Sequence, residues 1–245
     1  MTTTDSAATS LAETMARLRG AQKGHARGAP AYSVYVNRRI GRLFAAIAYR
    51  FGLTPNQVTL VSAAHTFVGI ALAASVPATW WSGILIAALL VAGYAWDSAD
   101  GQVARLLGGG TVAGEWLDHF VDALKIASLH LAVLIGLYRF GGLDEAALLV
   151  PIGYSIVATV TFFGMILNDL LKGARGVAST HERAGGTLGR SLLLLPTDFG
   201  AVCLVFLLWG VSPLFLVVYA ALFTVNVLFL VAAAVKWFRE MRRVG

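Results

Sequence analysis

Apolar residues in this 245-residue chain gather into long blocks that short polar segments separate. Six blocks stand out, and they predict membrane spans near 57–76, 79–104, 113–138, 146–171, 189–210 and 213–238. Most of them reach the roughly 17–25 residues that a helix needs to cross a bilayer. The pattern therefore predicts an all-α, polytopic membrane protein with six transmembrane helices.

A shorter amphipathic pattern precedes the first block. In residues 31–50, apolar side chains recur at helical spacing while arginines occupy the other side. This arrangement is typical of a helix that lies in the membrane interface. The apolar positions are Tyr32, Val36, Ile40, Leu43, Phe44 and Ile47, and the basic ones are Arg38, Arg39 and Arg42. Residues 1–28 read as a polar, partly disordered cytoplasmic tail, and residues 29–245 as one membrane domain.

Composition and charge agree with a membrane protein and indicate its orientation. Hydrophobic residues make up 58% of the chain and charged residues 13%, against about 25% charged in soluble domains. Of the 19 lysines and arginines, only Arg139 falls in a loop on the external side, so both termini are expected in the cytoplasm, at the cell (inner or plasma) membrane. The net charge of +6 then reflects topology and anionic headgroups, and we expect no nucleic-acid partner.

Four aspartates lie beside or inside the second and third predicted spans. Asp97 and Asp100 are three residues apart and Asp118 and Asp122 are four apart, so each pair shares one helix face. The glycines at 108–110 are expected to form the turn that brings the two faces together. Carboxylates at membrane depth are costly and are usually functional.

Carboxylate oxygens are the ligands that Mg²⁺ and Mn²⁺ prefer, and two such ions suit an in-line displacement at phosphorus. One alternative is structural: some aspartates cap helices or pair with Arg105 and Lys125. Another is an ion- or proton-coupled transporter, which also uses intramembrane acids. Gly101 and Arg105, interleaved with the acids, favour a phosphate ligand, because bare backbone allows close approach and a guanidinium binds phosphate bidentately.

The segment DSADGQVARLLGGGTVAGEWLDHFVD resembles the signature of the CDP-alcohol phosphatidyltransferase family (class I), D-x2-D-G-x2-A-R-x8-G-x3-D-x3-D. All eight specified positions match: Asp97, Asp100, Gly101, Ala104, Arg105, Gly114, Asp118 and Asp122. The resemblance covers roughly residues 31–240, and the family's layout is also an interfacial helix followed by six spans. The implied reaction is attack of an alcohol hydroxyl on a CDP-linked donor, most simply CDP-diacylglycerol, with release of CMP.

The resemblance also implies roles for individual residues. Asp97, Asp100, Asp118 and Asp122 match ligands of two Mg²⁺ or Mn²⁺ ions, and Asp122 matches the residue that takes the acceptor's proton. Positions that contact the CDP donor are matched by Asn56, Gln57, Val58, Thr59, Asp97, Gly101, Arg105 and Thr111. Family members commonly form homodimers, so a homodimer is expected.

The acceptor alcohol stays open. Arg183, Arg190 and Lys125 are candidate acceptor-binding residues. Family members that make phosphatidylinositol phosphate tend to carry a K-x-R-x-E-like run after the fourth span, which LKGARGVAST matches poorly. Phosphatidylglycerophosphate synthases tend to show an Arg-Glu pair there, where this chain has ILNDLL. Inositol phosphate, glycerol phosphate, serine or another polar alcohol fit, as does a water-soluble CDP-alcohol donor with a lipid acceptor.

Overall fold

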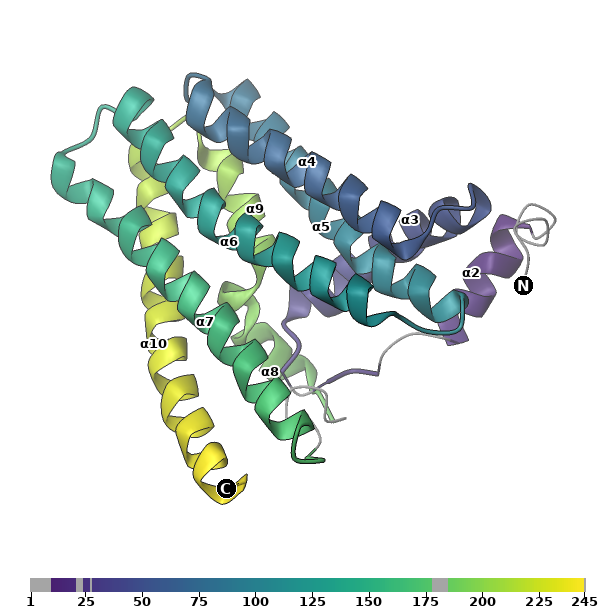
Figure 1. Cartoon of the computed structure of the whole chain (residues 1–245). Coiled ribbons are helices and arrows are strands. Elements are labelled where there is room, and N and C mark those ends of the chain that lie inside the picture. The colour runs from purple at the N-terminus through teal and green to yellow at the C-terminus, as the bar shows by residue number, and fades with distance from the viewer. Residues whose placement is uncertain (1–9, 21–23, 27, 178–184, 245) are drawn as a thin grey trace.

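The computed structural model describes residues 10–20, 24–26, 28–177 and 185–244. The secondary-structure elements in these ranges are all helices. Five of them are long and apolar enough to cross a membrane: α4 (Pro55–Ser75), α5 (Trp80–Leu106), α6 (Val112–Phe140), α7 (Leu149–Gly173, preceded by the 3₁₀ turn η2, Glu145–Leu148) and α10 (Ser212–Val244). The prediction of an all-α, multi-pass membrane protein is confirmed (Figure 1).

The fifth predicted span, 189–210, is divided into short pieces. These are α8 (Leu188–Leu193), η3 (Leu195–Thr197), α9 (Phe199–Val205) and η4 (Phe206–Leu208). Pro196 lacks the N–H that a continuous helix needs, and Asp198 accepts a hydrogen bond from Gly200 N (2.9 Å), which starts α9 anew. In the described residues, the structure thus has five long helices and one shorter apolar segment, Phe199–Leu208.

The region before the first span is helical, as the amphipathic pattern predicts. A π-helical turn, η1 (Ser33–Asn37), leads into α3 (Arg38–Arg50). The face that packs on α5 consists of small residues such as Gly41 and Ala45, whereas Val36 and Leu43 are 40% and 42% exposed. Val36 and Leu43 therefore point away from the protein, as expected for a helix that lies on lipid, whereas Phe44 turns inward and stacks on Trp96 of α5.

The N-terminal tail is not wholly separate from the membrane domain. Residues Leu11–Gly20 form α2, which packs on α3, and the Leu18 side chain is fully buried against Ala45, Val58 and Val103. Residues 1–9, 21–23 and 27 lie outside the described residues, and the partial disorder predicted for residues 1–28 stays a prediction.

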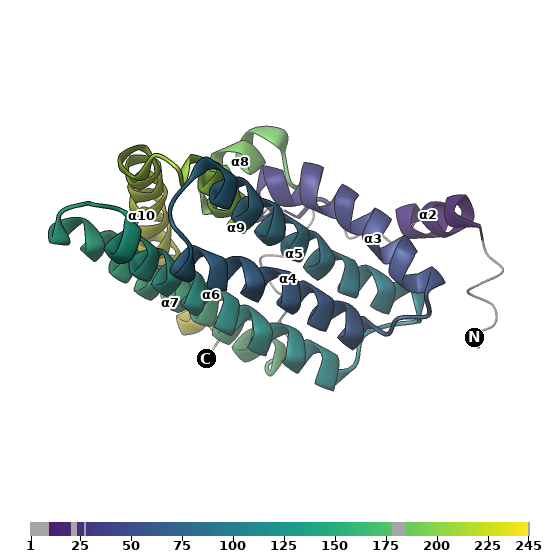
Figure 2. The same cartoon turned by 90° about the horizontal axis from the view of Figure 1, so that it is seen from above.

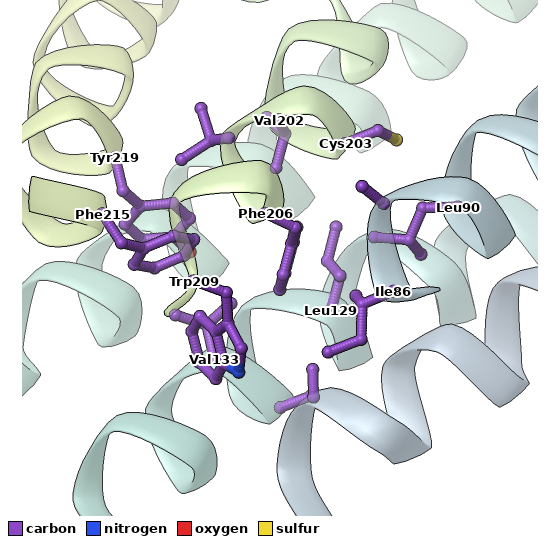
Figure 3. Close-up of a cluster of buried hydrophobic side chains, with 14 of the residues drawn as sticks. Ile86, Leu90, Leu129, Val133, Val202, Cys203, Phe206, Trp209, Phe215 and Tyr219 are labelled. Atoms are coloured by element: carbon purple, nitrogen blue, oxygen red, sulfur yellow. The ribbon is translucent and has the colours of Figure 1, made fainter. Parts of the chain in front are cut away.

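A hydrophobic core joins α5 and α6 to the C-terminal helices (Figure 3). Its members come from α4, α5, α6, α7, α9, η4 and the start of α10, and they include Ile86, Leu90, Leu129, Val133, Phe206, Trp209, Phe215 and Tyr219. Burial of these side chains holds α5 and α6 in place. The core lies away from the polar ends of the two helices, where the aspartates are.

Helices α4 and α5 approach each other closely. Ser62 Oγ donates to Gly93 O across the pair (2.9 Å), and a side chain at Gly93 would collide with Thr66. Seen from above, α4 lies between α5 and α6 along most of their length (Figure 2). This contact sets the position of α4 relative to the aspartates on α5.

Candidate active site

The turn between α5 and α6 brings the two aspartate pairs together. Gly108 and Gly109 have φ angles of +97° and +134°, which side-chain-bearing residues rarely adopt. Thr111 Oγ1 accepts from Gly114 N (3.0 Å) and so caps the start of α6. Beyond this turn, α4 packs against both helices and lies between them (Figure 2). The expected glycine turn is present.

Asp97, on α5, and Asp122, on α6, contact the same ammonium group. Lys125 Nζ donates to Asp97 Oδ1 and lies 2.8 Å from Asp122 Oδ1. Ligand atoms of Asp118, His119 and Asp122 lie within 4.8 Å of one another. Lys125 thus joins Asp97 to Asp122 across the hairpin, and Asp118 lies next to Asp122.

Asp100 is the most deeply buried of the four aspartates, at 8% exposed. Its Oδ2 accepts from Thr59 Oγ1 on α4 (2.7 Å), and its Oδ1 accepts from Gly101 N (2.5 Å). The side chain is thus held by hydrogen bonds from two directions, which reduces the cost of burying a carboxylate.

The donor set fits a hard divalent cation. Asp118, His119 and Asp122 could hold one ion through two carboxylates and an imidazole. Asp97 lies on the other side of Lys125, which contacts both Asp97 and Asp122. Oxygen-rich sites of this kind favour Mg²⁺ and Mn²⁺. The family signature specifies no residue at the position of His119, whose ring nitrogen lies within 4.8 Å of ligand oxygens of Asp118 and Asp122.

A cavity of about 160 Å³ opens beside Asp97 and Asp100. Its walls are Arg38, Asp97, Ser98, Asp100, Gly101, Gln102 and Arg105. Gly101 faces the Arg105 side chain, since a Cβ at Gly101 would lie in ordinary contact with Arg105 Nη1, 3.4 Å away. Gly101 and Arg105 thus line the same cavity as Asp97 and Asp100, and their predicted contact with the CDP donor stays a prediction.

Three cavity residues were missed by reasoning from sequence. Ser98 and Gln102 lie one turn apart on α5 between motif positions, so the helical spacing was a usable signal. Arg38 comes from α3, 59 positions before Asp97 in the sequence. The amphipathic pattern assigned it, with the other arginines of this helix, to the side that faces lipid headgroups. No local pattern separates it from Arg39 and Arg42.

The four residues predicted to contact the nucleotide from α4 differ in accessibility. Asn56 and Gln57 are exposed, and Asn56 Oδ1 reaches the α6 glycine Gly114. Gln57 forms a capping box with Thr54. Val58 is fully buried and Thr59 is 3% exposed, so their evident contacts are with protein. Their predicted donor contacts stay predictions.

The three candidate acceptor residues are placed differently. Lys125 lies within the aspartate cluster and is 4% exposed. Arg190 is exposed on α8, whose first residues are capped by Thr187. Arg183 lies outside the described residues. No contact in the described residues joins Arg190 to the aspartates.

Fold and site together define an integral-membrane protein whose second and third spans carry a carboxylate cluster suited to metal and phosphate chemistry. The model of the CDP-alcohol phosphatidyltransferase family matches residues 52–237. This match covers most of the chain, so the protein belongs to that family and is a CDP-alcohol phosphatidyltransferase, as the signature predicts.

Two curated relatives narrow the comparison. The chain is 31% identical over 165 residues to the phosphatidylinositol phosphate synthase of Mycolicibacterium smegmatis. The aligned region covers 66% of this chain and 68% of that protein. It is 34% identical over 162 residues to the synthase of the same name from Corynebacterium glutamicum, covering 64% and 66%. The chain thus spans about two thirds of each relative's length.

Solved structures share the fold. Mycobacterium tuberculosis phosphatidylinositol phosphate synthase with CDP-DAG bound matches with a TM-score of 0.55 and 22% identity, over 83% of this chain and 94% of that one. The same enzyme in complex with manganese and citrate gives a TM-score of 0.51 at 22% identity, over 83% and 89%.

Proposed function

We propose that this enzyme transfers a phosphatidyl group from CDP-diacylglycerol to a phosphorylated polyol of the inositol phosphate type, with release of CMP. The aspartate cluster at the α5–α6 turn, with its adjoining arginine-lined cavity, carries this proposal. Two observations support this donor and acceptor: the curated relatives are phosphatidylinositol phosphate synthases, and the similar Mycobacterium tuberculosis structure has CDP-DAG bound.

The four aspartates and His119 would hold two divalent ions, Mg²⁺ or Mn²⁺. When bound, these ions supply positive charge to the phosphate oxygens of the donor. Arg105, at the cavity wall, is positioned to bind a donor phosphate, and Gly101 allows the nucleotide to approach the α5 backbone.

Asp122 is the proposed base. Its side chain is 26% accessible, against 19% for Asp97, so it is open to an incoming hydroxyl. In the transfer, the acceptor oxygen forms a bond to the phosphorus next to the lipid, the bond from that phosphorus to CMP breaks, and the acceptor's proton passes to Asp122. The lipid donor would reach the site from the bilayer while the polar acceptor enters from water.

Orientation and assembly belong to the same proposal. The loops that carry almost all basic residues lie at the ends of the spans near the aspartates, which favours an active site on the cytoplasmic side of the membrane. A homodimer stays a prediction.

The test measures CMP release by purified protein in lipid nanodiscs that contain CDP-diacylglycerol. Inositol phosphate, free inositol, glycerol phosphate and serine are supplied in turn, each with Mg²⁺, with Mn²⁺ or with EDTA. We expect release only with a divalent ion and fastest with inositol phosphate. Faster release with glycerol phosphate or serine would overturn the acceptor, and release only from a soluble CDP-alcohol with diacylglycerol would overturn the donor.

Asp122→Asn tests the base. We expect CMP release to fall by at least about 100-fold, because general bases contribute about 10²–10⁴-fold and this carboxylate also belongs to the metal set. The matched control is Asp144→Asn, which alters an exposed aspartate in the loop before η2 and should leave the rate unchanged. Turnover of Asp122→Asn within tenfold of the unchanged protein would contradict the assignment.

A further inference from the structure

Lys125 places a positive charge in the middle of the aspartate cluster. It lies one helical turn after Asp122 on α6, and its ammonium bonds to Asp97 on α5 as well as to Asp122 (2.8 Å). The residue is 4% exposed, so water screens these contacts little. A single side chain therefore ties the two halves of the hairpin together through the carboxylates.

The family signature does not account for this lysine. Its last specified position is Asp122, and no residue is specified at the position of Lys125. The signature alone therefore accounts for the four carboxylates but not for the positive charge that lies between two of them.

An ammonium and a divalent cation compete for the same oxygens. Asp97 and Asp122 belong to opposite halves of the hairpin, so an ion held by either carboxylate has to share it with the ammonium of Lys125. A positive charge that stays within bonding distance also repels the incoming ion, whichever carboxylate oxygen each one occupies. At the same time, it offsets the mutual repulsion of the acids when metal is scarce.

We propose that Lys125 is a built-in counter-ion that competes with the divalent metal for Asp97 and Asp122. It stabilises the α5–α6 hairpin at low metal concentration and raises the metal concentration at which the site fills. This inference rests on the proposed function in one respect, namely that the aspartates are the metal ligands.

The experiment uses Lys125→Met, which keeps the side chain's length and removes its charge. Mn²⁺ alone is titrated into the full-length protein in detergent, and free Mn²⁺ is read by electron paramagnetic resonance. Thermal unfolding is followed in EDTA and in saturating Mn²⁺. We expect the Mn²⁺ dissociation constant to fall at least tenfold, and the melting temperature to fall in EDTA but to recover in Mn²⁺.

Two further variants separate charge from packing. Lys125→Arg keeps the charge, and its Mn²⁺ affinity should stay within threefold of the unchanged protein. Lys172→Met removes another buried lysine, which pairs with Glu240 of α10 at 2.5 Å. It should lower the melting temperature in EDTA and in Mn²⁺ alike, with the Mn²⁺ affinity unchanged.

The outcomes are distinct. An unchanged or weaker Mn²⁺ affinity in Lys125→Met overturns the inference, because the lysine would then support the ligands instead of competing for them. If that variant does not fold, Lys125→Gln is measured with the same expected direction. If Asp118→Asn binds Mn²⁺ as tightly as the unchanged protein, the metal site of the proposed function fails instead.

Discussion

The hydrogen bond from Thr59 to Asp100 offers a sharp test of how the site is built. Thr59 lies on α4 and is 3% exposed, and its Oγ1 donates to Asp100 Oδ2 over 2.7 Å. The same oxygen is 3.1 Å from Pro55 O, but one hydroxyl has one proton, and the carboxylate is the closer and charged acceptor. Thr59→Val keeps the shape and removes the donor.

The size of the effect follows from burial. A hydrogen bond to a charged group contributes about 1.5–3 kcal/mol, and a buried acceptor that loses its donor cannot turn to water. Since about 1.4 kcal/mol is a factor of ten, the loss corresponds to about 10- to 100-fold. We expect this loss in the apparent Mn²⁺ affinity and in turnover, because Asp100 loses the contact from α4 that orients its Oδ2 and keeps only the bond from Gly101 N.

The assay is CMP release as a function of Mn²⁺ concentration, with melting temperature measured in parallel. Thr66→Val is the matched control, because Thr66 lies on the same helix, is fully buried, and has a hydroxyl with no hydrogen-bond partner among the described residues. It should match the unchanged protein. A Thr59→Val enzyme with unchanged Mn²⁺ dependence and a raised KM for the donor alone would refute the positioning role and favour direct nucleotide contact.

Two more changes probe the turn and the cavity. Gly109→Ala should lower the melting temperature, because a φ of +134° costs a residue with a Cβ about 1–3 kcal/mol. The control Gly110→Ala lies at a position without positive φ and with open space around it, so it should leave the melting temperature unchanged. Equal melting temperatures of the two variants would contradict this reasoning. Arg105→Lys should raise the KM for CDP-diacylglycerol about tenfold, with a smaller change in kcat, because a lysine cannot bind phosphate bidentately. Initial rates at varied CDP-diacylglycerol concentration measure both constants, and an unchanged KM would exclude the donor contact.

Local patterns were sufficient to predict the elements that carry the chemistry. Helical spacing placed Asp97 with Asp100 and Asp118 with Asp122, and the glycine run marked the turn that joins them. Both are short-range properties of the chain, so the sequence displays them directly. The identity of the reaction also came from this segment, through the family signature.

Contacts between distant segments were not predictable in this way. Nothing near Thr59 indicates that its hydroxyl points at Asp100, because that depends on the close packing of α4 against α5 at Gly93. The break at Pro196 was overlooked because hydropathy averages over a window and does not register a missing N–H. Arg38 was likewise assigned to headgroups, since charge alone does not reveal which arginine of an interfacial helix turns inward.

The segment before α3 connects the cavity beside Asp97 and Asp100 to α8. Arg38 lines the cavity and donates to Gly24 O (3.3 Å), while the neighbouring His25 Nε2 lies 2.8 Å from Ser191 Oγ on α8. Ser191 Oγ in turn donates to Ala29 O (2.7 Å). Arg190, a predicted acceptor-binding residue, adjoins Ser191. These contacts therefore tie its helix to the segment that ends at the cavity wall, although the two are far apart in the chain, and no pattern near either of them indicates the connection.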